Sequence, residues 1–176
     1  MTMNTLPRAR NFAIAALATC LAGSVIHAQT PVPAQTAPTS QPKPIYPDAA
    51  AAPADIKAAL AKADREHKRV ILDFGGNWCG DCKALASYFH KAPNDDLLKN
   101  NFVLVEVNIG KFDQNLDIAK KYEVPLKLGV PALAVLDAKG NILLSQKHGE
   151  FESMRSLDPS ALTKFLEQWK PNATSK

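Results

Sequence analysis

Cysteine is scarce in this sequence: the 176 residues include only three, Cys20, Cys79 and Cys82. A small secreted protein held together by disulfides would need more cysteines at wider spacing. Cys20 falls inside the N-terminal leader described below, so one Cys-x-x-Cys pair remains in the rest of the chain. These counts exclude a disulfide scaffold and make that pair the feature to explain.

Ligands for a closed metal site or a haem are also missing. A zinc site built on the two cysteines would need two further ligands, and His67, His90 and His148 show no paired spacing. A c-type haem needs histidine directly after the second cysteine, where this chain has Lys83. We therefore expect no metal site of this kind and no bound cofactor.

The sequence lacks a strong charge of either sign. Its net charge is +4, but Arg8 and Arg10 lie in the leader, which leaves 19 basic and 17 acidic residues elsewhere, a net charge of +2. No cluster of basic residues marks a nucleic-acid-binding surface. A solvated surface of mixed charge is the simpler interpretation, and no nucleic-acid partner is expected.

The one long apolar run, Phe12 to Ile26, is too short for an ordinary membrane span. It follows the basic residues Arg8 and Arg10 and precedes an acceptable cleavage site at residues 26–28. The pattern predicts a secretory signal peptide over residues 1–28. The alternatives are an uncleaved membrane anchor and, less well matched, a lipoprotein signal ending at Cys20. Export implies an oxidising compartment, which in a bacterium is the periplasm.

Residues 29–53 are rich in proline, alanine, threonine and glutamine. A segment of this composition buries little apolar surface and stays extended or disordered. We expect it to be a tether that carries no site, followed by one folded domain over residues 54–172.

The Cys-x-x-Cys pair follows a buried strand. The run from Val70 to Phe74 is apolar and rich in strand-forming residues, Gly75-Gly76-Asn77 interrupts it, and a helical segment follows the cysteines. A thiolate at a helix N-terminus is stabilised by unpaired backbone N–H groups and by the helix dipole, which lowers its pKa. Cys79 would then be the outer, attacking thiol, and Cys82, one turn later, could displace a mixed disulfide.

Helical and strand patterns alternate along the rest of the domain. Helices are expected over residues 54–67, 84–90 and 113–122 and from Asp158 onward, with a further turn at 95–100. Strands are expected over residues 70–74, 102–109, 132–137 and 142–146, the last two joined by a hairpin turn. A helix separates the first two strands, which predicts that they run parallel.

The motif around the cysteines resembles the active site of the thioredoxin superfamily. The shared residues are Asp73, Phe74, Trp78, Cys79, Gly80, Cys82 and Lys83. Further similarities lie at residues 107–109, at 121–124 and at Gly129-Val130-Pro131. The departures are Gly75-Gly76, Asp81 where thioredoxin has proline, and a longer loop at residues 125–128. The resemblance implies an α/β thioredoxin fold, a mixed central sheet with helices on both faces.

The resemblance also implies roles for the residues nearest the thiols. Cys79 would be the nucleophile and Cys82 the resolving thiol, with a plain structural disulfide as the alternative. Pro131 would follow a cis peptide bond and pack against the cysteines, and its loop with Val130 would pair with substrate backbone. The alternative is an ordinary trans proline. Trp78 would be a flat surface for substrates, or else a core tryptophan.

Three acidic residues complete the predicted site. Asp73 matches a buried aspartate beneath the resolving cysteine; burial should raise its pKa and let it take a proton from Cys82. The alternative is an aspartate paired with lysine. Glu106 either lies close to Asp73 or faces solvent. Asp81 adds negative charge between the thiols, although an acid in a first helical turn also suits the helix dipole.

Together these features predict an exported thiol–disulfide oxidoreductase that acts on protein thiols and disulfides. The motif is also similar to the C-terminal domain of membrane thiol:disulfide interchange reductases, which favours a reductase with a membrane electron donor. A monomer is expected, in contact with a membrane only through an uncleaved leader. The alternatives are a copper-binding module or chaperone using the same thiolates, and a redox-inert interaction domain.

Overall fold

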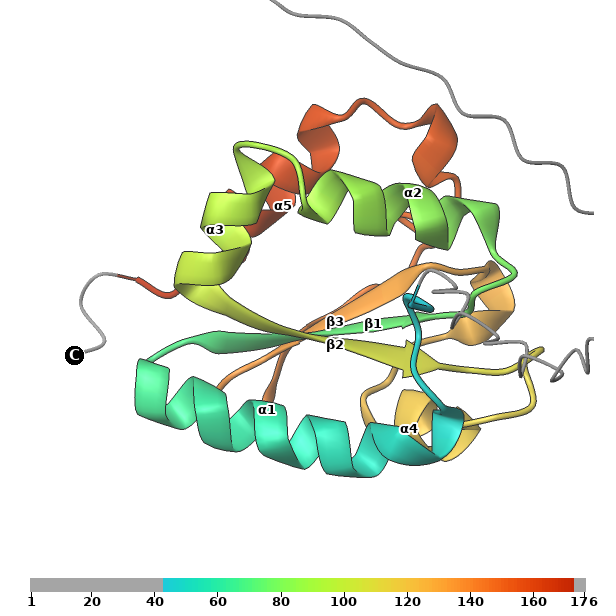
Figure 1. Cartoon of the computed structure of the whole chain (residues 1–176), viewed down its shortest axis with the longest axis horizontal. Coiled ribbons are helices and arrows are strands. Elements are labelled where there is room, and N and C mark those ends of the chain that lie inside the picture. Colours follow the sequence, from blue (N-terminus) through green and yellow to red (C-terminus); the bar gives the residue numbers. More distant parts are fainter. Residues whose placement is uncertain (1–42, 173–176) are drawn as a thin grey trace, which may run out of the picture. The chain divides into compact units, whose positions relative to one another are not determined.

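Four strands form one mixed sheet in the order β2-β1-β3-β4 (Figure 1). The computed structural model describes residues 43–172. The strands are β1 (Arg69–Gly75), β2 (Phe102–Asn108), β3 (Ala132–Leu136) and β4 (Ile142–Ser145). As predicted, β1 runs parallel to β2, and β3 and β4 form an antiparallel hairpin; β3 is also antiparallel to β1. The apolar run in β1 therefore lies at the centre of the sheet, next to both β2 and β3.

Helices cover both faces of this sheet (Figure 1). The helices α1 (Ala52–Glu66) and α4 (Leu116–Lys121) lie on one face. The helices α2 (Gly80–Phe89), α3 (Asn94–Asn101) and α5 (Ser160–Trp169) lie on the other. Short 3-10 turns are η1 (Ala49–Ala51), η2 (Leu126–Leu128) and η3 (Met154–Ser156). This arrangement confirms the predicted fold class. Among residues 43–172, no helix combines the length and apolar character needed to cross a membrane.

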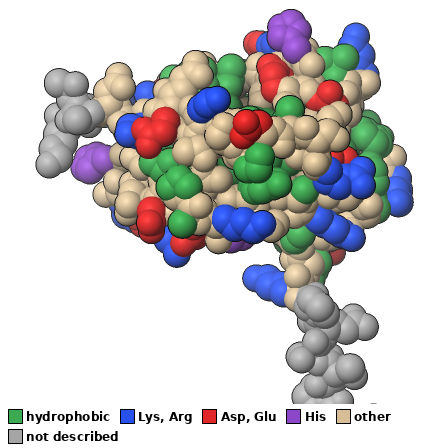
Figure 2. Space-filling model, turned by 90° about the horizontal axis from the view of Figure 1, so that it is seen from above, with side chains coloured by type: hydrophobic (Ala, Val, Ile, Leu, Met, Phe, Trp, Pro, Cys, Tyr) green, Lys and Arg blue, Asp and Glu red, His purple; other side chains and the backbone are tan. Residues whose placement is uncertain are grey.

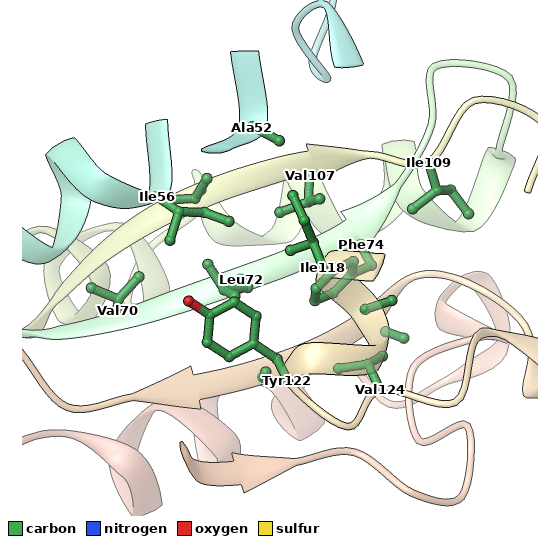
Figure 3. Packing of buried hydrophobic residues seen from close by; sticks show 14 of the residues in the cluster. Ala52, Ile56, Val70, Leu72, Phe74, Val107, Ile109, Ile118, Tyr122 and Val124 are labelled. Carbon is green, nitrogen blue, oxygen red and sulfur yellow. The ribbon is translucent and has the colours of Figure 1, made fainter. Parts of the chain in front are cut away.

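The core is divided in two by the sheet. Val70, Leu72 and Phe74 of β1 pack with α1 and α4 (Figure 3), whereas Ile71 packs with α2 and α5. Successive strand residues point to opposite faces, so Asp73 shares the face of Ile71. A carboxyl group is thereby buried on the face that α2 covers, with 1% of Asp73 exposed.

The domain begins earlier than the sequence suggested. The tether expected over residues 29–53 is wrong from Tyr46 onward, because Tyr46 is 1% exposed and α1 starts at Ala52. Asn108 Nδ2 donates to the Pro47 carbonyl, and Asn115 Nδ2 donates to the Ala49 carbonyl. Side chains distant in sequence thus supply hydrogen bonds to the backbone carbonyls of a proline-rich segment. The predicted signal peptide and residues 29–42 of the tether lie outside the described residues.

Two further elements differ from their predicted bounds. A helix, α3, stands where only a turn was expected. Its first turn carries Asp95 and Asp96, which suit the positive end of the helix dipole. The helix expected from Asp113 begins only at Leu116, because Asn115 adopts a left-handed conformation (φ 55°) and ends the preceding loop. That loop, residues 109–115, lies beside the end of β1 that precedes the cysteines, because the Ile109 amide donates a hydrogen bond to the Gly75 carbonyl.

The exposed surface has the mixed charge that the composition suggests. On the face seen in Figure 2, Lys and Arg side chains gather toward the lower right, most Asp and Glu side chains lie toward the top and the left, and hydrophobic side chains lie between them.

Candidate active site

The two cysteines form a disulfide where β1 gives way to α2. Cys79 is the N-cap residue of α2, and its Sγ accepts a hydrogen bond from the Cys82 backbone N–H at 3.0 Å. Cys79 is 5% exposed and Cys82 is fully buried. Cys79 is therefore the more accessible sulfur, as a nucleophile must be. A thiolate at this position would be stabilised by N–H groups at the start of α2.

The loop before β3 packs against this disulfide. The Val130–Pro131 peptide bond is cis, so the alternative of a trans proline is wrong. Cys79 Sγ lies 3.5 Å from the Val130 carbonyl oxygen. The long loop at residues 125–128 forms η2 and ends at Gly129, whose φ of 115° favours glycine. The predicted substrate-pairing loop is thus in contact with the outer sulfur.

Asp73 lies on β1 beneath the start of α2. Tyr46 Oη donates a hydrogen bond of 2.8 Å to Asp73 Oδ2, and Oδ1 has no partner among the described residues. The alternative of a lysine partner is wrong. Burial raises the pKa of Asp73 to about 8, against the opposing effect of the Tyr46 hydrogen bond. The shift has the direction predicted from the sequence, and it keeps most of this carboxyl protonated at neutral pH.

Glu106 lies beside Asp73 on the neighbouring strand, β2. The two residues are register partners on β1 and β2, so their side chains share one face. Glu106 is half-buried, and burial raises its pKa. Its charge also raises the pKa of Asp73. The structure therefore brings the two acids together instead of turning Glu106 outward.

The position of Gly75 explains one departure from the thioredoxin motif. A Cβ atom on Gly75 would lie 2.4 Å from Tyr46 Oη and 2.8 Å from Cys82 Sγ. The space that a side chain would fill is thus taken by the Tyr46 hydroxyl and the inner sulfur. Sequence reasoning missed Tyr46 because it lies in the proline-rich segment, 27 positions from Asp73.

Trp78 is a surface residue beside the cysteines. It is 41% exposed, so the alternative of a core tryptophan is wrong. Its ring lies 5.6 Å from that of Phe112, and Lys111 Nζ lies 4.7 Å from its centre. The indole N–H donates to the Gly110 carbonyl. The loop at residues 109–115 therefore fixes the ring in place, and Phe112, also 41% exposed, extends the aromatic surface.

Asp81, the residue between the cysteines that replaces proline, is paired with Arg155 of η3. Its carboxylate accepts from the Arg155 backbone N–H at 2.9 Å, from Nε at 3.1 Å and from Nη2 at 3.0 Å. These hydrogen bonds lower the pKa of Asp81. The Arg155 guanidinium also lies over Gly80. The negative charge expected between the thiols is thus neutralised by a residue 74 positions away, which no sequence signal identified.

Removing this guanidinium should raise the pKa of Cys79 in the reduced protein. In Arg155→Gln the charge of Asp81 loses its partner, so we expect an upward shift of roughly half a pH unit, the size of one added charge near the surface. Thiolate absorbance as a function of pH measures it. Arg65→Gln, an exposed arginine of α1, is the matched control. An unchanged Cys79 pKa in Arg155→Gln would show that the pair does not act on the thiol.

A metal site would have to rest on the two thiolates alone. Within residues 43–172, no cluster of three or more His, Cys, Asp or Glu side chains is placed to hold a metal ion.

Comparison with known proteins places this site in a family. A family model described as thioredoxin-like matches residues 51–138. The disulphide isomerase from Xylella fastidiosa Temecula1 has a similar solved structure, with a TM-score of 0.69 and 32% identity over 73% of this chain and 98% of that one.

Curated relatives match over shorter regions. The H-type thioredoxin of Chlamydomonas reinhardtii is 43% identical over 58 residues, which is 31% of this chain and 51% of that protein. The thiol:disulfide interchange protein DsbD of Vibrio cholerae is 32% identical over 87 residues, 49% of this chain but 14% of that protein. This chain thus spans about half of the first relative and a small part of the second.

The similarities and the disulfide pair together support thiol–disulfide oxidoreductase chemistry at Cys79 and Cys82. The matched region includes both cysteines, Asp73 and Pro131. The chain belongs to the thioredoxin-like family.

Proposed function

We propose that this chain reduces disulfides in exported proteins by thiol–disulfide exchange. One observation carries the proposal: the Cys79–Cys82 disulfide caps α2 and touches the Val130–Pro131 loop, and its inner sulfur borders the same space beside Gly75 as the hydroxyl that bonds the buried Asp73 carboxyl group. This arrangement supplies an accessible sulfur, an inner sulfur and a proton acceptor.

The reaction begins with the reduced pair. The Cys79 thiolate attacks one sulfur of a substrate disulfide, so that a Cys79–substrate bond forms, the substrate S–S bond breaks and one substrate thiolate leaves. Cys82 then loses its proton to the Asp73 carboxylate and attacks Cys79 Sγ. The Cys79–substrate bond breaks, the second substrate thiolate leaves and the Cys79–Cys82 disulfide forms. Two electrons pass from the pair to the substrate.

The surface beside Cys79 is suited to an extended polypeptide. The Val130 carbonyl next to Sγ would pair with substrate backbone, and the exposed rings of Trp78 and Phe112 would pack against apolar side chains. The substrate class is therefore protein disulfides accessible in a loop or an unfolded segment.

The proposed direction of electron flow is supported by the carboxyl group near the pair. Strong oxidants of this chemistry have a stabilised reduced form. When it is ionised, the Asp73 carboxylate disfavours a thiolate nearby, which weakens that stabilisation. The similarity to an interchange protein supports a membrane electron donor, and the predicted signal peptide supports a periplasmic location. We propose that the domain acts as a monomer.

Reduction of insulin by the chain in the presence of dithiothreitol tests this function. We expect the wild type to accelerate the reaction and Cys79→Ser to lose at least about two orders of magnitude in rate, because the nucleophile is missing. Metal titration of the reduced protein tests the copper-binding alternative in parallel. A wild type no faster than Cys79→Ser, with stoichiometric Cu(I) uptake, would favour the alternative.

A further inference from the structure

Tyr46 is held rigidly next to the candidate active site by Asn77, a residue of the loop before Trp78. The Tyr46 backbone N–H donates to Asn77 Oδ1 at 3.0 Å, and Asn77 Nδ2 donates back to the Tyr46 carbonyl at 2.8 Å. Tyr46 is 1% exposed. These two bonds and the burial fix the ring, so its hydroxyl has one position.

That position is in contact with the buried carboxyl and on the same side of Gly75 as the inner sulfur. Tyr46 Oη donates to Asp73 Oδ2 at 2.8 Å and borders the same space beside Gly75 as Cys82 Sγ. We propose that Tyr46 is a positioning residue for the resolving step, which holds Asp73 toward Cys82 and sets the proton affinity of its carboxyl group. This inference rests on the function proposed above and adds a residue outside the Cys-x-x-Cys region.

The polar and charged groups near Asp73 come from several elements. The N-terminal segment contributes Tyr46, β2 contributes Glu106 and α2 contributes Cys82, while the register partner on β3 is the apolar Leu133. Burial and the charge of Glu106 raise the pKa of Asp73, and the Tyr46 hydrogen bond is the opposing influence. Burial and Asp73 also raise the pKa of Tyr46, so its hydroxyl keeps its proton and stays a donor.

The hydrogen bond divides the roles of the two carboxylate oxygens. Oδ2 is occupied by Tyr46, whereas Oδ1 has no partner in the described part of the chain. In the resolving step the Cys82 proton would pass to Oδ1, directly or through a water molecule, and the sulfur would attack Cys79 Sγ. Tyr46 stabilises the ionised carboxylate beforehand, so that more of the enzyme has a base ready near neutral pH.

The test is the titration of the Asp73 carboxyl in the oxidised protein, followed by carbon NMR in the wild type, Tyr46→Phe and Tyr122→Phe. Tyr122 is a second buried tyrosine, 3% exposed, on the α4 side of the sheet, and is the matched control (Figure 3). We expect an inflection near pH 8 in the wild type. In Tyr46→Phe it should move up by about one pH unit or more, because a hydrogen bond to the charged form is lost. Tyr122→Phe should leave it unchanged.

Single-turnover kinetics of the resolving step supply the second readout. In Tyr46→Phe, the pH at which the rate of the resolving step rises should shift upward together with the carboxyl titration. The double variant Tyr46→Phe/Asp73→Asn should have the same resolving rate as Asp73→Asn alone. An unchanged carboxyl titration in Tyr46→Phe would overturn the inference whatever the activity. A shifted titration with a wild-type rate profile would overturn the role in resolution. Absence of any disulfide reduction by the wild type would instead overturn the proposed function, while the titration still decides whether Tyr46 controls Asp73.

Discussion

Cys82→Ser should trap a covalent complex between Cys79 and a substrate protein. Cys79 can still attack a substrate disulfide, but serine cannot displace the mixed disulfide. We expect turnover to fall by about two orders of magnitude or more, and a Cys79-linked adduct to accumulate that dithiothreitol releases. Non-reducing electrophoresis after incubation with a disulfide-bonded substrate measures it.

Two control proteins, one variant and the wild type, make this experiment decisive. Cys79→Ser leaves only the fully buried sulfur, so it should form little adduct. The wild type should form little because Cys82 resolves the intermediate. Equal trapping through Cys82 in the Cys79→Ser protein would contradict the assignment of Cys79 as the nucleophile.

Asp73→Asn should stabilise the domain near pH 8, and its effect on stability should become more favourable as pH rises. Burial raises the pKa of Asp73 from 3.8 to about 8, so the folded state binds a proton that the unfolded state has released between these values. The contribution of protonated Asp73 to the free energy of unfolding is therefore fully present below about pH 4 and is lost as pH rises towards 8. One pKa unit corresponds to about 1.4 kcal/mol, which sets an upper limit of roughly 6 kcal/mol, of which about 5 kcal/mol is reached at pH 8. An unpaired amide N–H in the variant costs about 1 to 3 kcal/mol.

Urea unfolding of the oxidised protein at pH 4 and pH 8 measures this effect. We expect the variant to be more stable than the wild type by about 2 to 4 kcal/mol at pH 8, and less stable than the wild type at pH 4, where mainly the cost of the unpaired amide remains. Asp64→Asn, an exposed position of α1, is the control for loss of a surface charge. A difference between Asp73→Asn and wild type that does not change with pH would mean that Asp73 is ionised in the folded protein.

The catalytic centre could be predicted because its signals are local. A strand, a glycine break and a helix follow one another within residues 69–89, and this order alone places Cys79 at a helix N-terminus. The apolar surroundings of Asp73 within β1 likewise predict its burial. The Gly129-Val130-Pro131 match identified the cis proline, which the sheet then brings next to Cys79.

The residues that sequence reasoning missed contact partners that are far away in the sequence. Tyr46 lies in a segment whose composition suggests disorder, and its order depends on Asn77, Asn108 and Asn115, which have no local pattern. Arg155 reaches Asp81 only because η3 folds back over α2. Glu106 could be assigned to the neighbourhood of Asp73 only once the register of β1 and β2 was known.

The reduction potential of the Cys79–Cys82 pair, measured in dithiothreitol and glutathione buffers, tests the central claim most directly. A reductase that draws electrons from a dedicated donor predicts a value near that of thioredoxin, about −270 mV. A value near that of a strong periplasmic oxidant, about −120 mV, would contradict the account and mean that the chain forms disulfides in its substrates.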